Sequence, residues 1–126
     1  MAHVEIISFG YLHDSPPPAH VTLDLRHHFR DPHVSPELRH MTAHDEPVRA
    51  AVLRTPGIAQ LVTATAAAIS AFAAGPSTGP ITVADGCAGG RHRAPTFAQA
   101  LADQLTANGH TVTVQHRDMH QPVVNR

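Results

Sequence analysis

The chain contains no lysine and no tryptophan, and its 126 residues include a single cysteine. Without lysine there is no Walker A sequence, so nucleotide hydrolysis by the P-loop mechanism is excluded. One cysteine excludes an intramolecular disulfide and is typical of a reducing compartment. The net charge of −1 and the 4% of aromatic residues are unlike the basic composition of sequence-independent nucleic-acid binders.

Long apolar runs and the pattern of a signal peptide are also missing, so we expect no membrane span and a cytoplasmic location. The length allows one hydrophobic core. We therefore expect a single domain over residues 1–126, with its core at about residues 4–118 and a loose tail at residues 119–126.

Short β-branched runs alternate with longer segments of helical periodicity, and a polar, proline-punctuated loop is expected at His27–Met41. The expected strands are Val4–Ser8, Val21–Leu25, Ile81–Ala84 and Thr111–Gln115, and the expected helices are Asp45–Leu53, Ile58–Phe72 and Pro95–Ala107. This order predicts an α/β fold with a small, mainly parallel sheet of about four strands and helices on both faces.

The most informative segment follows the third expected strand and is a glycine-rich turn that leads into a helix. Free backbone N–H groups and the helix dipole at such a turn favour an anion. Cys87, Gly90 and Arg93 also have the C-x-x-G-x-x-R spacing of cysteine-dependent phosphatases. Gly86 and Ala94 stand where those enzymes usually carry His and Ser or Thr, so we favour phosphate binding without a catalytic residue. A phosphatase with Cys87 as nucleophile stays an alternative.

Gly86–Arg93 resembles the G-C-T-G-G-x-H-R-S signature of the C-terminal domain of the RapZ family, also called the YvcJ family. Further similar motifs follow in the same order from about Val4 to Asp118: Ser8–Tyr11, Leu23–Arg26, Asp31–His33, Thr42–Val48 and His116–Arg117. The resemblance implies a bacterial regulatory domain that stands without the family's P-loop ATPase domain. It also implies two partners, an amino-sugar phosphate and structured RNA.

The expected ligand-binding residues lie at the carboxyl ends of the expected strands, where open α/β sheets bind ligands. They are His13, Asp24, Arg26, His33, Cys87, Ala88, Gly89, Gly90, His92 and Arg93. For Asp24 and Arg26, a structural ion pair is an equally good interpretation.

RNA binding as the main role is a further alternative, with Arg26, Arg30, Arg39 and Arg117 as the expected contacts. The chain has twelve histidines but no zinc-like spacing, so we expect no metal and no cofactor. The sequence does not decide whether the chain forms a homo-oligomer.

Overall fold

A computed structural model describes all residues from Met1 to Arg126 and contains one four-stranded sheet. The strands are β1 (His3–Gly10), β2 (Val21–Asp24), β3 (Ile81–Cys87) and β4 (Thr111–His116). The helices are η1 (a 3₁₀ turn, Pro32–Val34), α1 (Pro36–Arg39), α2 (Glu46–Leu53), α3 (Ile58–Ala73) and α4 (Arg93–Ala107). All strand pairs are parallel in the order β2-β3-β1-β4, which confirms the α/β class and the four-stranded parallel sheet.

The sheet has one apolar face because side chains alternate along each strand. Val4 pairs with Ile81 and Ile6 pairs with Val83, so these four buried side chains lie together. They pack with buried apolar side chains of α3 and α4 in a single core. Burying each such aliphatic side chain contributes about 1.5–3 kcal/mol to the free energy of unfolding.

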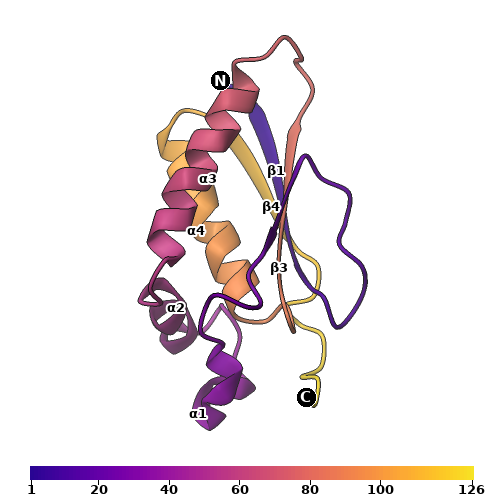
Figure 1. Cartoon of the computed structure of the whole chain (residues 1–126), viewed down its shortest axis with the longest axis vertical. Helices are drawn as coiled ribbons and strands as arrows, with labels where there is room; N and C mark the ends of the chain where they lie inside the picture. The colour runs from indigo at the N-terminus through magenta and orange to yellow at the C-terminus, as the bar shows by residue number, and fades with distance from the viewer.

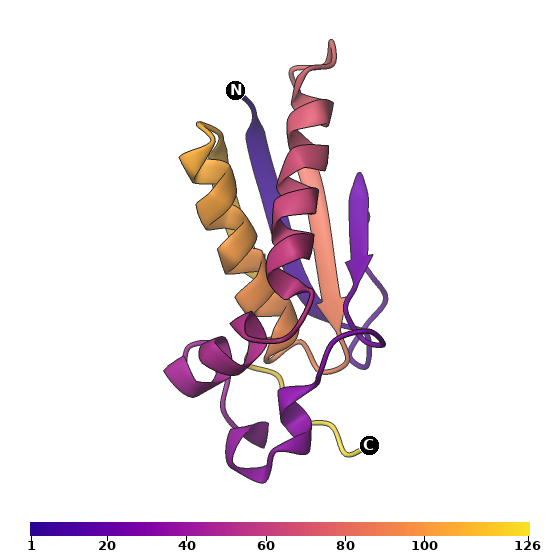
Figure 2. The ribbon, with the colours of Figure 1, turned by 60° about the vertical axis from the view of Figure 1, so that its left-hand side comes forward.

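Both long helices lie on this apolar face, so the expectation of helices on both faces is wrong. Figure 2 shows α3 and α4 side by side in front of the sheet, and they pack against each other. The connection from β2 to β3 through α3 and that from β3 to β4 through α4 run in the same direction across the sheet. Right-handed crossovers in one direction place their helices on one face.

The crossover from β1 to β2 runs in the opposite direction and passes the other face of the sheet (Figure 1). It contains no helix because Pro16, Pro17 and Pro18 remove backbone donors and favour an extended chain. The face that it passes is more polar, with Glu5 beside Thr82 and Thr113 in the register. The sheet is therefore covered by helices on one side only.

Two glycine segments meet backbone to backbone at the end of β1. A Cβ on Gly10 would lie 2.5 Å from the carbonyl carbon of Gly89, and a Cβ on Gly90 would lie 2.8 Å from the amide nitrogen of Gly10. Gly90 also has a φ of 76°, in the left-handed region that favours glycine. Side chains at Gly10 or Gly90 would therefore separate the two segments.

Helices α2 and α3 meet at an angle of 80°. Gly57, with a φ of 95°, precedes α3 and lets the chain turn at this break. By length and composition no single helix could cross a membrane, and α2 and α3 reach that length only as this bent pair.

Two segments differ from the expectation drawn from their composition. The expected loop His27–Met41 contains the short helices η1 and α1. The tail at residues 119–126, expected to be loose, lies against the rest of the chain: Met119 is 3% exposed, and Arg126 forms an ion pair with Asp31. Specific partners, which composition does not reveal, hold both segments.

We predict that Gly10→Ala lowers the free energy of unfolding by about 1–3 kcal/mol, because the added methyl overlaps the backbone of Gly89. Urea unfolding followed by circular dichroism measures the change. Gly79→Ala is the matched control, since its Cβ would be 3.6 Å from the nearest atom, the Ser77 hydroxyl oxygen. Equal stability of the two variants would contradict the close contact.

Candidate functional site

The carboxyl ends of all four strands lie at one edge of the sheet, as the sequence predicts. Gly10 pairs with Cys87, Asp24 with Gly86, and Ser8 with His116. The segments after these strands therefore form one end of the molecule, at the bottom of Figure 2. The helix α4 begins at this end, directly above the sheet edge.

The glycine loop, residues Cys87–His92, connects β3 to α4 at this end. Its backbone N–H groups at Ala88, Gly89, Arg91 and His92 make no hydrogen bond within the protein. The loop precedes the positive end of the α4 dipole. These free donors are the part of the expected anion site that the structure retains.

Cys87 is buried and has the character of a thiol. Its sulfur accepts the N–H of Ala94 at 3.4 Å, and the side chain is 2% exposed. Burial raises the pKa of Cys87, and this effect outweighs the lowering by the Arg93 guanidinium and the nearby N–H groups. A nucleophilic thiolate is therefore disfavoured at neutral pH.

Arg93 is 2% exposed and binds the chain itself, although the sequence predicts a phosphate contact. Its Nη1 donates to the carbonyl oxygens of Leu25, Arg26 and Phe29 at 3.0–3.1 Å. Its Nη2 lies 3.1 Å from Asp31. Because carbonyl groups at the exit of β2 take these donors, the guanidinium has a structural role, and only its Nε is left buried without a partner.

Arg91 and His92 join the glycine loop to residues 40–43. His92 is buried, with its Nε2 2.9 Å from the carbonyl oxygen of Met41, and Arg91 donates to the carbonyl oxygens of His40 and Met41. Burial lowers the pKa of His92, so its imidazole is neutral at pH 7. The Nε of Arg91 is buried without a hydrogen-bond partner.

The C-terminal tail lies over the glycine loop. Arg126 contacts Asp31 at 2.7 Å, and Arg91 donates to the carbonyl oxygen of Gln121 at 2.9 Å. Together they enclose a hollow with about 10 Å³ of free space, lined by Asp31, His33, Cys87, Gly89, Arg91, His92, Val123, Val124 and Arg126. Four predicted site residues, His33, Cys87, Gly89 and His92, thus share one hollow.

Asp31 is the acidic group of this hollow. Burial raises the pKa of its carboxyl. The N–H of His33 and the guanidiniums of Arg93 and Arg126 lower this pKa by more, so the net shift is downward and the group is ionised. Burial and the charge of Arg126 lower the pKa of His33. A neutral His33 and an ionised Asp31 therefore lie beside the free N–H groups.

The other predicted ligand residues lie at the edge of this site. Asp24 and Arg26 form an ion pair at 2.7 Å, and this partner lowers the pKa of Asp24 to about 2. Arg26 lies 3.7 Å from the centre of the Tyr11 ring, which favours the structural interpretation of the pair. His13 follows the segment in which the N–H of Leu12 donates to the carbonyl of Ala88, and its Nε2 is buried without a partner.

Three of the four arginines expected to contact RNA already have partners. Arg26 pairs with Asp24, Arg39 donates to the carbonyl oxygen of His33, and Arg117 pairs with Asp118. Arg30 is exposed. RNA binding by these residues stays a prediction.

Sequence reasoning missed a row of buried polar groups under the start of α4. Asp85 and Ser8 are fully buried neighbours on β3 and β1, and the Ser8 hydroxyl lies 2.7 Å from Nδ1 of His116. Both carboxylate oxygens of Asp85 lack partners, and burial raises its pKa well above the usual value. In the sequence, the one sign of this buried group is Asp85 itself, an acidic residue within the largely apolar segment that forms β3.

Comparison with known proteins gives one family. The family model of the RapZ C-terminal domain matches residues 2–120. A protein of Thermobifida fusca (strain YX) with the name "Nucleotide-binding protein" is 36% identical over 117 residues, which are 90% of this chain and 40% of that protein. A protein of Desulforudis audaxviator (strain MP104C) with the same name is 34% identical over 124 residues, 95% of this chain and 42% of that protein. The chain thus spans about two fifths of these relatives.

We predict that Arg93→Ala lowers the free energy of unfolding by about 3–5 kcal/mol, because it leaves Asp31 and three carbonyl groups without their buried donor. Urea unfolding measures this loss. Arg30→Ala, at an exposed position, should change stability by less than about 0.5 kcal/mol. A fully stable Arg93→Ala variant would show that the guanidinium is not structural.

We predict that Asp85→Val raises the free energy of unfolding at pH 7 by about 1–3 kcal/mol, because two buried oxygens without partners are removed. The pKa of Asp85 is higher in the folded chain than in the unfolded chain, so the native state holds this proton longer as pH rises. The carboxyl therefore costs more stability at pH 7 than at pH 4, and the gain of the variant should grow with pH. Thermal unfolding at both pH values checks the sign, and a gain that shrinks with pH would contradict it.

Proposed function

The chain belongs to the RapZ C-terminal domain family, and we propose that it is a non-catalytic regulatory domain that binds a small phosphorylated molecule at the glycine loop. The observation that carries the proposal is the group of free backbone donors at Ala88, Gly89, Arg91 and His92. Backbone N–H groups at a helix N-terminus bind phosphate oxygens without the need for a lysine.

Side-chain donors around the loop support the same ligand. The Nε atoms of Arg91 and Arg93 and the Nε2 atom of His13 are buried without a hydrogen-bond partner, and Arg91 is the one of these residues that lines the hollow. Each such atom carries a desolvation cost that an acceptor oxygen would remove.

A phosphosugar suits the hollow better than a nucleotide does. The free space is small, and its lining holds no phenylalanine or tyrosine on which a base could stack. The ionised carboxylate of Asp31 is an acceptor for a hydroxyl or amino group, which an amino-sugar phosphate carries next to its phosphate. The name of the relatives, nucleotide-binding protein, supports a phosphorylated ligand for proteins of which this chain covers about two fifths.

Phosphatase chemistry has weaker support than binding. A cysteine phosphatase needs a thiolate that attacks phosphorus, whereas burial raises the pKa of Cys87. The position after Arg93 is Ala94, whose side chain has no hydroxyl to stabilise the leaving thiolate. The same loop therefore holds a phosphate without the groups that would cleave it.

The tail is the element that regulates entry. A phosphate needs more room than the 10 Å³ left under Val123, Val124 and Arg126, so these residues move away or rearrange when the ligand binds. The ion pair of Arg126 with Asp31 lies at the surface, with the two side chains 26% and 19% exposed, and such a pair contributes about 0–1 kcal/mol, so a ligand can displace it.

We predict that glucosamine 6-phosphate raises the melting temperature of the chain, and that Gly89→Ala weakens its binding about tenfold or more. A methyl at Gly89 would lie 3.9 Å from Arg126, so the fold accepts it, but it adds bulk to a residue that lines the small hollow beside the free N–H groups. Calorimetric titration with this compound, inorganic phosphate and AMP measures the affinities.

Gly79→Ala, before the opposite end of β3 from the loop and without a close contact, is the matched control. Removal of residues 122–126 should raise the affinity, because the hollow is then open. Wild-type affinity in Gly89→Ala would place the ligand elsewhere. Tightest binding of AMP would replace the phosphosugar with a nucleotide.

A further inference from the structure

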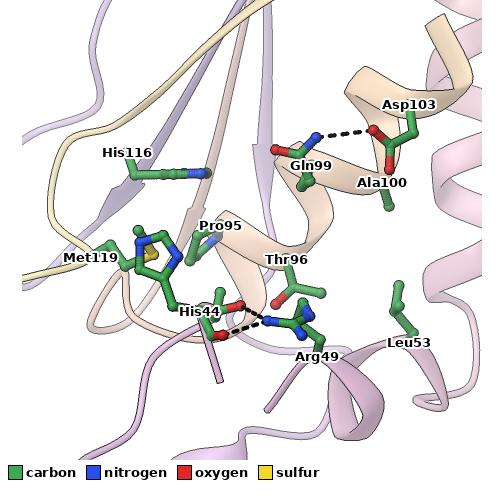
Figure 3. Close-up of a pocket in the computed structure, with 11 residues that line it drawn as sticks. His44, Arg49, Leu53, Pro95, Thr96, Gln99, Ala100, Asp103, His116 and Met119 are labelled. Carbon is green, nitrogen blue, oxygen red and sulfur yellow. Dashed lines mark hydrogen bonds between the residues drawn. The ribbon is translucent and has the colours of Figure 1, made fainter. Parts of the chain in front are cut away.

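A second and larger hollow lies on the other side of the start of α4, between α2, α4 and the end of β4 (Figure 3). Its volume is about 280 Å³, and none of its lining residues lines the hollow at the glycine loop. It is therefore a separate site, and its chemistry differs from that of the anion loop.

Thr96 is the polar group that makes this hollow unusual. The side chain lines the hollow and is 3% exposed, and its hydroxyl has no hydrogen-bond partner. Thr55, by contrast, is a buried threonine just after the end of α2, and it donates its hydroxyl to the carbonyl of Ala51. In Figure 3 Thr96 faces the same space as His44 and Arg49. A ligand that accepts from this hydroxyl would remove its desolvation cost.

Arg49 supplies positive charge at the same end. Its Nη1 donates to the carbonyl oxygens of Ala43 and His44, which holds the guanidinium in place. Its Nε and Nη2 make no hydrogen bond, and no carboxylate lies within ion-pair distance of it. The side chain is only partly exposed. A fixed guanidinium with a free edge fits the two oxygens of a carboxylate.

His116 completes this polar end. Its Nδ1 is engaged with the Ser8 hydroxyl, which leaves Nε2 for a ligand, and His44 stacks on His120 at 5.4 Å. Asp103, the acidic residue of the hollow, accepts from Gln99 and lies at the far end in Figure 3. The charges are thus separated along the hollow, with the cation beside Thr96.

Apolar side chains form the rest of the lining. Leu53 is 49% exposed although it is large and apolar, and it faces α4 across the hollow beside Ala100. Pro95 and Met119 close the floor near His116. Pockets with an apolar body and a few convergent polar groups are typical of small-molecule sites.

From this arrangement we propose that the hollow binds a small monocarboxylic acid with an apolar body. Its carboxylate accepts from Arg49 and from the Thr96 hydroxyl, and its apolar part packs on Leu53 and Ala100. The single free guanidinium matches one negative charge, and Asp103 at the other end disfavours a second one. Inorganic phosphate, which has no apolar part, should not occupy this site.

The proposal is tested by titrating the ¹⁵N-labelled chain with phenylacetate and observing the amide NMR signals, with uncharged phenylacetamide as the matched compound. Phenylacetate should shift the signals of Arg49, Thr96 and Ala100, and phenylacetamide should bind at least about tenfold more weakly. Arg49→Gln should weaken phenylacetate binding about tenfold or more. Arg54→Gln, the exposed arginine at the end of the same helix, should leave it unchanged.

Thr96→Val separates a ligand contact from a structural role. The change keeps the shape and removes a buried hydroxyl without a partner, so the melting temperature should stay equal or rise while affinity for phenylacetate falls several-fold. Gly89→Ala should not affect this binding, so failure here is distinguishable from failure at the glycine loop. The proposal is overturned if phenylacetate causes no shifts at millimolar concentrations, or if Arg49→Gln binds it as tightly as the wild type.

Discussion

The buried guanidinium of Arg93 is the interaction on which the functional end of this molecule depends. It sits at the first residue of α4 and binds three carbonyl groups of the segment that leaves β2, as well as Asp31. A segment without regular structure has carbonyl groups that need donors, and a single arginine can satisfy several of them at fixed geometry. This arginine thereby sets the distance between the glycine loop and the polar segment opposite it.

The shape of the glycine loop follows from a second constraint, the direct contact of Gly10 with Gly89 and Gly90. Because these glycines have no side chains, the end of β1 lies directly against the loop. The positive φ of Gly90 then turns the chain toward α4. The N–H groups at the turn then have no acceptor within the protein. The anion site that we propose rests on this backbone geometry, and it does not require Arg93, whose guanidinium binds carbonyl groups instead.

The chain between residues 40 and 44 lies between the two hollows: Ala43 and His44 line the larger one, and Arg91 and His92, which line the smaller one, are hydrogen-bonded to this segment. On one side, Arg91 and His92 bind the carbonyl groups of His40 and Met41, and the N–H of Ala43 donates to the carbonyl of Arg91. On the other side, Arg49 binds the carbonyl groups of Ala43 and His44. A change in the position of this short segment would therefore alter the lining of both hollows.

The sequence by itself determined the α/β class, the parallel sheet and the glycine loop, because these depend on local signals. Apolar alternation marks strands, periodicity marks helices, and Gly89 and Gly90 stand next to each other in the chain. The convergence of Cys87, His92 and His33 could also be predicted, since parallel strands place their carboxyl ends at one edge. The family motifs pointed to the same segments.

The tertiary structure alone decided which donors are free and which face the helices cover. Arg93 and Arg26 look alike in the sequence, but Arg93 is buried on carbonyl groups of a distant segment and Arg26 pairs with Asp24. The direction of each crossover placed α3 and α4 on one face, and strand order is not encoded locally. Thr96, Asp85 and the tail acquired their roles through partners, or the lack of them, far away in the chain. Such contacts depend on packing at long range, which no short sequence pattern specifies.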